Sequence, residues 1–216
     1  MRLLLINPNT TVSVTRRMAG LARALAPEGT IIDAATGAFG SPYIASRAAA
    51  VIGAHAALEI AQRLVGTANP SAYDAILIAC FGEPGLEALR EEVPIPVLGM
   101  AEESFRAARR HGPRFAVVTG GAAWGPMLCD FAILRGLGDA LLAVRTLAID
   151  GGAIARDPDA ALPLLAAEAR AARAGGADCV ILGGAGLVGL ARRLPPVGCP
   201  VLDCLECLIE AALATA

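Results

Sequence analysis

A cysteine at the end of a short aliphatic run is the residue in this chain best suited to acid–base chemistry. Cys80 ends the run DAILIAC and precedes FGEPGL, in which small residues and a proline lead into a segment of helical length. A thiol at a helix N-terminus lies near unpaired backbone N–H groups, which lower its pKa from about 8.5 toward neutrality. The same N–H groups can stabilise an enolate or oxyanion on a substrate. The segment therefore indicates either a reactive thiolate or, as is common for a free cysteine, a small buried side chain.

The segment around Cys80 recurs once, and the second copy lacks the cysteine. DAILIACFGEPGL returns 104 residues later as DCVILGGAGLVGL, which aligns Cys80 with Gly184 without a gap. The register holds further along, because PVLGMAEESF from Pro96 aligns with PVLDCLECLI from Pro200. A constant offset over strand-like and helix-like segments indicates a duplicated supersecondary unit. Glycine has no side chain that can move a proton, so the two copies are chemically unequal.

Two further loops offer polar groups near predicted strand ends. Asn9 lies in NPNTT, directly after the first aliphatic run. In open α/β sheets, ligands bind beyond the carboxyl ends of the strands, where loops lead into helices. Asn9 and its threonine neighbours can either cap the next helix or present donors to a carboxylate or imide oxygen. The segment 39–44, which contains Ser41, either wraps over a small ligand or is an ordinary surface loop.

A second cysteine is a candidate to replace the thiol that is missing at Gly184. The run PVLDCLEC predicts a strand, then Asp203 as the helix N-cap, Cys204 in the first turn and Glu206 at the capping-box position. This helix N-terminus also favours a thiolate. The first-half counterpart of Cys204 is Met100 and not Cys80, however, so the repeat gives no reason to place Cys204 across a substrate.

The other chemistry-bearing residues have structural explanations. Cys204 and Cys207 form a C-x-x-C, but without a second pair, and with only two histidines in the chain, we do not expect a zinc site. His55 is expected on a helix surface. Glu83 either orients a ligand, serves as an acid or complements a helix dipole. The chain has no Walker motif and no well-placed dinucleotide fingerprint, so no cofactor is expected. Three cysteines are expected to pack inside or beside helices and strands: Cys129, Cys179 and Cys199.

The elements that position these residues alternate along the chain. Runs rich in Leu, Ile and Val end in Gly, Asn, Thr or Pro, and each precedes an alanine-rich segment of helical length, which favours parallel sheets covered by helices. The strands are predicted at 3–6, 30–33, 75–79, 97–98, 115–119, 143–147, 179–183 and 201–202. Together with the repeat, this predicts an α/β protein of two pseudo-symmetric, doubly wound, four-stranded parallel halves with the site between them.

The same pattern predicts where the halves begin and end. We expect the first half at 1–98 and the second at 99–203, with a C-terminal helix at 204–216 that can pack back on the first half. The strongest break in the chain is the His-Gly-Pro at 111–113, because glycine and proline end a helix whose last turn is basic.

Composition excludes several classes of partner. The chain has 216 residues, of which 56% are hydrophobic and 18% charged, and a net charge of -2 without long runs of one sign. A nucleic-acid or membrane partner is therefore not expected. The first residues predict a buried strand and not a signal peptide, so we expect a cytoplasmic protein whose six cysteines are free thiols.

Three motifs together resemble one known family. INPNT after the first strand, CFGEPGL after the third and LGGAGL in the second half are similar to motifs of the aspartate/glutamate/hydantoin racemase superfamily, most closely its hydantoin and allantoin racemase branch. The resemblance implies a cofactor-independent isomerase, expected as a homo-oligomer, that acts on a small carbon acid. It also implies a pair of cysteines, one per half, on opposite sides of the stereocentre. Cys80 matches the first position, whereas Gly184 stands where the family pattern, close to LGCAGL, has the second cysteine.

The resemblance also implies a set of substrate contacts and leaves three functions open. The contacts are Asn9, Ser41, Phe81, Gly82 and Thr119, with backbone donors from Ala185 and Gly186. The first function is racemisation of a hydantoin, allantoin or amino acid with Cys80 as the base. The second is decarboxylation or cis-trans isomerisation with a single cysteine. The third is ligand binding without turnover.

Overall fold

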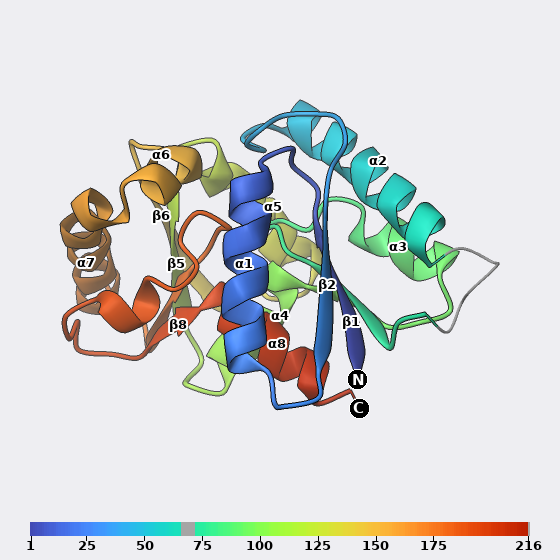
Figure 1. The fold of residues 1–216 in the computed structure, drawn as a ribbon. Helices are drawn as coiled ribbons and strands as arrows, with labels where there is room; N and C mark the ends of the chain where they lie inside the picture. Colours follow the sequence, from blue (N-terminus) through green and yellow to red (C-terminus); the bar gives the residue numbers. More distant parts are fainter. Residues whose placement is uncertain (66–71, 216) are drawn as a thin grey trace. The chain divides into compact units, whose positions relative to one another are not determined.

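The computed structural model describes residues 1–65 and 72–215 and divides the chain into two compact units. Unit 1 comprises Met1–Met100 and Leu208–Ala216, and unit 2 comprises Ala101–Cys207. Each unit contains one four-stranded parallel sheet with helices packed against it (Figure 1). The predicted α/β class and the two parallel four-stranded sheets are therefore confirmed.

Unit 1 has the strand order β2-β1-β3-β4, and all of its strand pairs are parallel. Helix α1 packs against β2 on one side of the sheet, while α2 and α3 pack together on the other (Figure 1). This arrangement follows from right-handed crossovers that run in opposite directions from β1. The elements are β1 (Arg2–Asn7), α1 (Val12–Leu25), β2 (Ile31–Thr36), α2 (Arg47–Leu64), β3 (Ala75–Ile78), α3 (Leu86–Glu92) and β4 (Val97–Gly99).

Unit 2 repeats this topology with the order β6-β5-β7-β8, again with every pair parallel. Its elements are α4 (Met100–Arg109), β5 (Phe115–Gly120), α5 (Trp124–Leu134), β6 (Leu141–Leu147), α6 (Gly151–Arg156), α7 (Pro158–Ala174), β7 (Cys179–Leu182), the 3-10 turn η1 (Ala191–Arg193) and β8 (Val201–Asp203). The last helix, α8 (Cys204–Leu213), begins in unit 2, and its residues from Leu208 on belong to unit 1. All eight predicted strands are present, with ends that differ from the predicted bounds by up to three residues.

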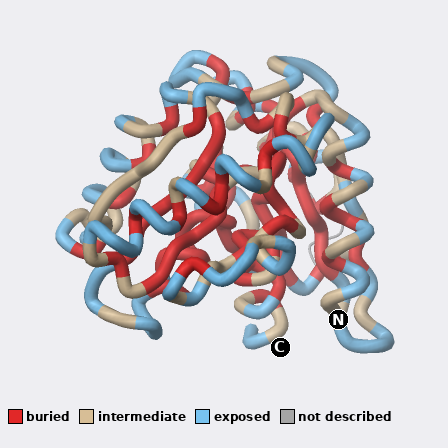
Figure 2. The backbone as a smooth tube through the Cα atoms, turned by 90° about the vertical axis from the view of Figure 1, so that its left-hand side faces the viewer, coloured by how far each residue is buried: buried red, intermediate tan, exposed pale blue. Residues whose placement is uncertain are grey.

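Burial explains which strands the sequence marks most clearly. Every residue of β3, β5 and β7 is buried, because helices cover both faces of these central strands (Figure 2). The edge strands β2 and β6 are only partly buried, so their sequences mix polar and apolar residues. Their ends were therefore placed less accurately: β2 continues to Thr36, which pairs with Asn7.

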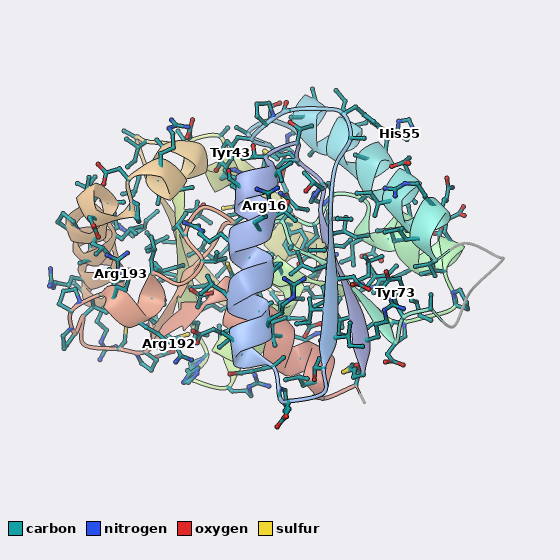
Figure 3. All side chains as sticks on the ribbon, in the orientation of Figure 1. Arg16, Tyr43, His55, Tyr73, Arg192 and Arg193 are labelled. Carbon is teal, nitrogen blue, oxygen red and sulfur yellow. The ribbon has the colours of Figure 1, made fainter. Side chains whose placement is uncertain are left out.

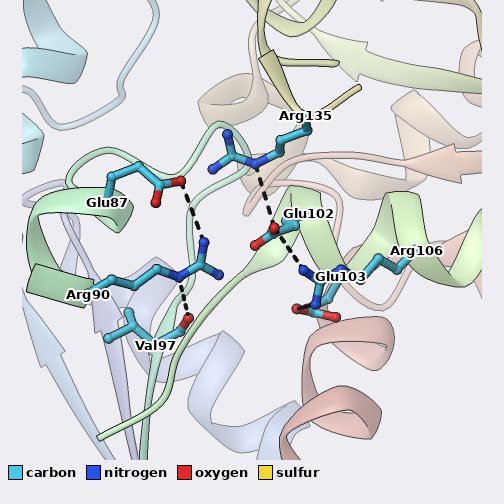
Figure 4. Close-up of polar contacts among 7 residues, drawn as sticks. All are labelled: Glu87, Arg90, Val97, Glu102, Glu103, Arg106 and Arg135. Carbon is cyan, nitrogen blue, oxygen red and sulfur yellow. Dashed lines mark hydrogen bonds and ion pairs between the residues drawn. The ribbon is translucent and has the colours of Figure 1, made fainter. Parts of the chain in front are cut away.

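Helix α4 follows the last strand of unit 1 in sequence but packs within unit 2. The Phe105 ring lies 4.9 Å from that of Phe115 and 5.7 Å from that of Phe131. On its polar side, Arg106 forms ion pairs of 3.0 Å with both Glu102 and Glu103 (Figure 4). The helix ends at Arg109, just before the predicted break at 111–113. That break lies inside unit 2, because α4 packs in unit 2 and unit 1 ends at Met100.

Candidate active site

Cys80 lies at the carboxyl end of the central strand β3. The amide N–H of Ala79 still donates to the carbonyl of Ile6 on β1 at 2.8 Å, so the chain leaves the sheet at Cys80. Two successive turns then shape the loop: Glu83 N donates to Cys80 O at 3.0 Å, and Leu86 N donates to Glu83 O at 3.1 Å. The Cys80 side chain is 6% exposed. The loop thus holds the thiol at the sheet edge where α/β proteins bind ligands.

The structure favours the second of the two interpretations of Cys80, a buried thiol, over a thiolate with a lowered pKa. Burial and, to a smaller extent, the negative charge of Glu83 together raise the pKa of the Cys80 thiol to about 12. The expected lowering by a helix N-terminus does not operate, because α3 begins only at Leu86, with Gly85 as its N-cap. At neutral pH Cys80 is therefore a thiol, which is the form that donates a proton.

Glu83 also differs from the prediction. The first turn of α3 contains Glu87, whereas Glu83 precedes the helix and does not complement its dipole. Its side chain is 4% exposed, and its φ is 52°, in the left-handed region that non-glycine residues rarely adopt. The sequence signal for this unusual carboxylate is its place between Gly82 and the pair Pro84-Gly85, which mark a tight, irregular loop.

Asn9 is fixed by a buried hydrogen-bond network at the end of β1. Its Oδ1 accepts from Asn7 Nδ2 and from Thr11 N, both at 2.9 Å, and Asn7 Nδ2 also donates to Thr15 Oγ1 at 2.9 Å. Thr11 is the N-cap of α1 but makes no side-chain cap bond, so Asn9 orders the approach to the helix through Thr11 N. Because the Oδ1 of Asn9 is occupied, its Nδ2 is the group that can face a ligand as a donor.

The Ser41 loop is tied to the Asn9 loop. Thr10 N donates to Ser41 O at 3.2 Å, and Thr11 Oγ1 donates to Pro42 O at 2.6 Å. Since β1 lies between β2 and β3, these two loops and the loop after Cys80 leave the same edge of the sheet in unit 1. The predicted residues that unit 1 brings to this edge are Asn9, Ser41, Cys80, Phe81 and Gly82.

Gly184 occupies the equivalent position in unit 2 with a different backbone. Its φ is +132°, whereas Cys80 does not have a positive φ. A Cβ built on Gly184 would meet Leu187 Cδ1 at 3.4 Å and Thr119 Oγ1 at 3.5 Å, which are ordinary contacts. The site therefore has room for a side chain, but its backbone conformation favours glycine.

The other predicted residues of unit 2 lie around the same loop. Thr119 is 2% exposed near the end of β5, beside the loop after β7. Ala185 is buried, and a Cβ on Gly186 would lie 2.7 Å from the carbonyl carbon of Gly151, so position 186 admits no side chain. The sequence analysis did not identify this close approach of the loop to the start of α6.

Cys204 lies beneath the Gly184 loop. Its Sγ donates to Gly184 O at 3.8 Å, yet the residue is 0% exposed, and burial together with the charge of Asp203 raises the pKa of its thiol. Asp203 caps α8 as predicted, because its Oδ1 accepts from Leu205 N at 3.0 Å. Its Oδ2 accepts from Gly189 N at 2.6 Å. Cys204 therefore contacts the right loop but has no surface open to a substrate.

The remaining candidates take no part in either loop. His55 is exposed on α2, and its ring contacts that of Phe39 at 5.0 Å (Figure 3). Within residues 1–65 and 72–215, no cluster of His, Cys, Asp or Glu side chains could hold a metal ion. In the same part of the chain, no helix combines the length and hydropathy needed to cross a membrane.

Comparison with known proteins identifies the family of the chain. The Asp/Glu/hydantoin racemase family profile matches residues 3–212. The chain belongs to this family. It is 31% identical over 214 residues to hydantoin racemase from Paenarthrobacter aurescens, covering 98% of this chain and 89% of that protein. It is 33% identical over 205 residues to hydantoin racemase from Pseudomonas sp. (strain NS671), covering 94% and 81%.

A solved structure extends the likeness to three dimensions. The crystal structure of allantoin racemase from Pseudomonas fluorescens superposes with a TM-score of 0.89 and 30% sequence identity, covering 99% of this chain and 90% of that one. As a member of the Asp/Glu/hydantoin racemase family, the protein is an isomerase of the racemase type. Within this family fold, the Cys80 loop and the Gly184 loop occupy the two equivalent strand ends.

Proposed function

We propose that the protein is a cofactor-independent racemase of hydantoin-type carbon acids, such as a 5-substituted hydantoin or allantoin, with Cys80 as its acid–base group. One observation carries the proposal: the sole cysteine of the two repeat loops lies at the carboxyl end of β3, at the same edge of the sheet as the ordered Asn9 loop after β1. The hydantoin and allantoin racemases among its relatives support the substrate class. We expect a homo-oligomer in the cytoplasm, where free thiols stay reduced.

The proposed chemistry uses the acidity of a carbon next to a carbonyl. Cys80, once deprotonated, removes the proton from the stereocentre, and the electron pair moves onto the carbonyl oxygen as an enolate. The Nδ2 of Asn9 and the backbone N–H groups of Phe81 and Gly82 are the unit 1 donors for the oxygens of such a ligand. Thr119 with Ala185 and Gly186 forms the corresponding set in unit 2. Return of a proton from a water molecule to the other face completes the inversion.

A second function is favoured by two observations together. Gly184 has no acid–base side chain, and the raised pKa of Cys80 keeps that thiol protonated at neutral pH. A protonated thiol on one side of a substrate is suited to quenching a carbanion that is formed by loss of carbon dioxide. Decarboxylation of a small, carbonyl-activated malonate is therefore the alternative reaction.

One experiment separates these functions. Enantiopure hydantoins, allantoin and amino acids are incubated with the protein in heavy water, and optical rotation and deuterium entry at the stereocentre are followed by polarimetry and proton NMR. Racemisation that is lost in Cys80→Ala supports the proposal. Deuterium entry without loss of chirality indicates chemistry on one face only, and malonate substrates are then tested.

A third outcome is that the protein converts none of the tested compounds. If a ligand binds equally well to the wild type and to Cys80→Ala while neither protein changes it, both catalytic proposals are wrong. The protein is then a binding protein.

A further inference from the structure

Glu83 has a costly conformation within the Cys80 loop. Among the residues that the structure describes, it is the one non-glycine residue with a positive φ, and its carboxyl group is buried with the rest of the side chain. Such a backbone costs on the order of 1–3 kcal/mol and persists only where the surrounding structure enforces it. Glutamate is also among the residues least often buried. Both features indicate that this loop is built to hold a carboxyl group in one place.

The end of β4 forms the seat for this carboxyl group. A Cβ built on Gly99 would lie 2.5 Å from Glu83 Oε2, closer than real contacts allow, so the carboxyl group rests directly on the Gly99 Cα. Gly99 does not have a positive φ, and its backbone therefore does not require glycine. The absence of a side chain at position 99 leaves the space that the Glu83 carboxyl group occupies.

The repeat relates residue 83 to a residue that contacts the cysteine position of unit 2. Its counterpart in unit 2 is Leu187, and the Cδ1 of Leu187 lies 3.4 Å from a Cβ built on Gly184, the counterpart of Cys80. In unit 2 the residue three positions after the cysteine position therefore contacts that position. In unit 1 a turn joins the two residues, because Glu83 N donates to Cys80 O at 3.0 Å, and the charge of Glu83 raises the pKa of the Cys80 thiol.

Each unit has a buried carboxylate near the end of its last strand, but the carboxylate comes from a different segment in the two units. The counterpart of Gly99 is Asp203, whose oxygens accept from the backbone N–H groups of Gly189, Leu205 and Glu206. Asp203 is thus a structural cap. In the unit that has the cysteine, the strand end carries no side chain and the carboxylate comes from the cysteine loop itself. The buried carboxylate thus belongs to the cysteine loop in the unit whose repeat loop contains a cysteine.

We propose that Glu83 is a positioning residue that accepts the thiol proton of Cys80, so that Cys80 can remove a proton from the substrate. The inference rests on the proposed function of Cys80. In the first step the Sγ–H bond breaks and a carboxyl O–H bond forms, so a thiol and a carboxylate become a thiolate and a carboxylic acid. In the second step the thiolate takes the proton from the substrate carbon, whose electron pair stays on the substrate as an enolate. The buried pair carries one negative charge before and after the first step, which avoids burying a second charge.

The test measures the thiol and the turnover separately. Glu83→Gln keeps the shape of the side chain and removes its charge, and Glu87→Gln makes the same change at an exposed residue of α3 that pairs with Arg90 (Figure 4). The alkylation rate of Cys80 by iodoacetamide is followed from about pH 7 to about pH 10 by mass spectrometry of the Cys80 peptide. Glu83→Gln raises this rate about tenfold at a given pH, because the thiolate no longer faces a carboxylate. Glu87→Gln leaves it unchanged.

The expected effect of Glu83→Gln on turnover is opposite to its effect on the alkylation rate. Glu83→Gln lowers kcat for hydantoin racemisation at least about tenfold, although its thiolate is more available, because the amide cannot accept the thiol proton. Gly99→Ala, which displaces the carboxyl group, gives a similar loss. An unchanged alkylation rate in Glu83→Gln, or an unchanged kcat, overturns the inference. The alkylation result needs no substrate, so it decides on the Glu83–Cys80 pair even if no hydantoin is racemised and the proposed function fails.

Discussion

Replacing Gly184 by cysteine tests whether unit 2 keeps the form of an acid–base site. The change restores the thiol that the repeat lacks, and the contacts of 3.4 and 3.5 Å to Leu187 and Thr119 leave room for its Cβ. The φ of +132° at this position is unfavourable for any residue with a side chain, at a cost of about 1–3 kcal/mol. For a chain of this size, each kcal/mol lowers Tm by about 2–4 °C.

The matched control is Gly184→Ala, which introduces the same strain without a thiol. We expect both variants to lose a similar amount of Tm, about 2–12 °C, in thermal unfolding followed by circular dichroism. Racemisation by Gly184→Cys should exceed that by Gly184→Ala, because only the former adds a proton-transfer group.

Two results would refute this reasoning. If Gly184→Ala is as stable as the wild type, the backbone at Gly184 is not strained for a side chain. If the two variants have equal racemisation rates while their Tm falls as expected, a thiol at position 184 does not reach the stereocentre.

Three further predictions follow from burial and hydrogen bonding. The pKa of Cys80 is raised to about 12, so its protonated form stabilises the fold at neutral pH, and this contribution is lost as the pH rises toward that value. In urea unfolding, Cys80→Ala should therefore lose less free energy of unfolding at alkaline pH than the wild type does. Asp203→Ala removes the cap of α8 and the acceptor for Gly189 N, and should destabilise the fold by about 1–3 kcal/mol in the same assay. Asp203→Asn keeps the Oδ1 acceptor and should lose less stability. Cys204→Ala should keep racemisation within about twofold of wild type, because its thiol is fully buried against Gly184 O; a loss comparable to that of Cys80→Ala would identify Cys204 as the replacement thiol.

The central strands and the repeat were predictable because both follow from short-range patterns. The run AILI of β3 is buried on both faces, and such a strand is continuously apolar in sequence. The cap formed by Asp203 is local as well, since its partners are the next two or three residues along the chain. Edge strands such as β2 carry a weaker signal, because one side of each residue is partly open to solvent.

The properties that the sequence did not reveal depend on contacts between distant segments. The loop after Cys80 reads as a helix start, yet the helix begins at Leu86, and burial rather than a dipole decides the pKa of the thiol. The contact of Glu83 with Gly99 joins the loop after β3 to the end of β4. Helix α4 follows unit 1 in sequence, and only the packing of Phe105 against Phe115 assigns it to unit 2.

The most direct test of the account is deuterium entry at the stereocentre of one enantiopure 5-substituted hydantoin in heavy water, comparing the wild type with Cys80→Ser. Serine keeps the size of the side chain but is a far weaker acid–base group. The account predicts that the wild type exchanges the proton and inverts the centre, and that Cys80→Ser, with an unchanged Tm, does neither. Exchange at the wild-type rate by folded Cys80→Ser would contradict the central claim that Cys80 moves the proton.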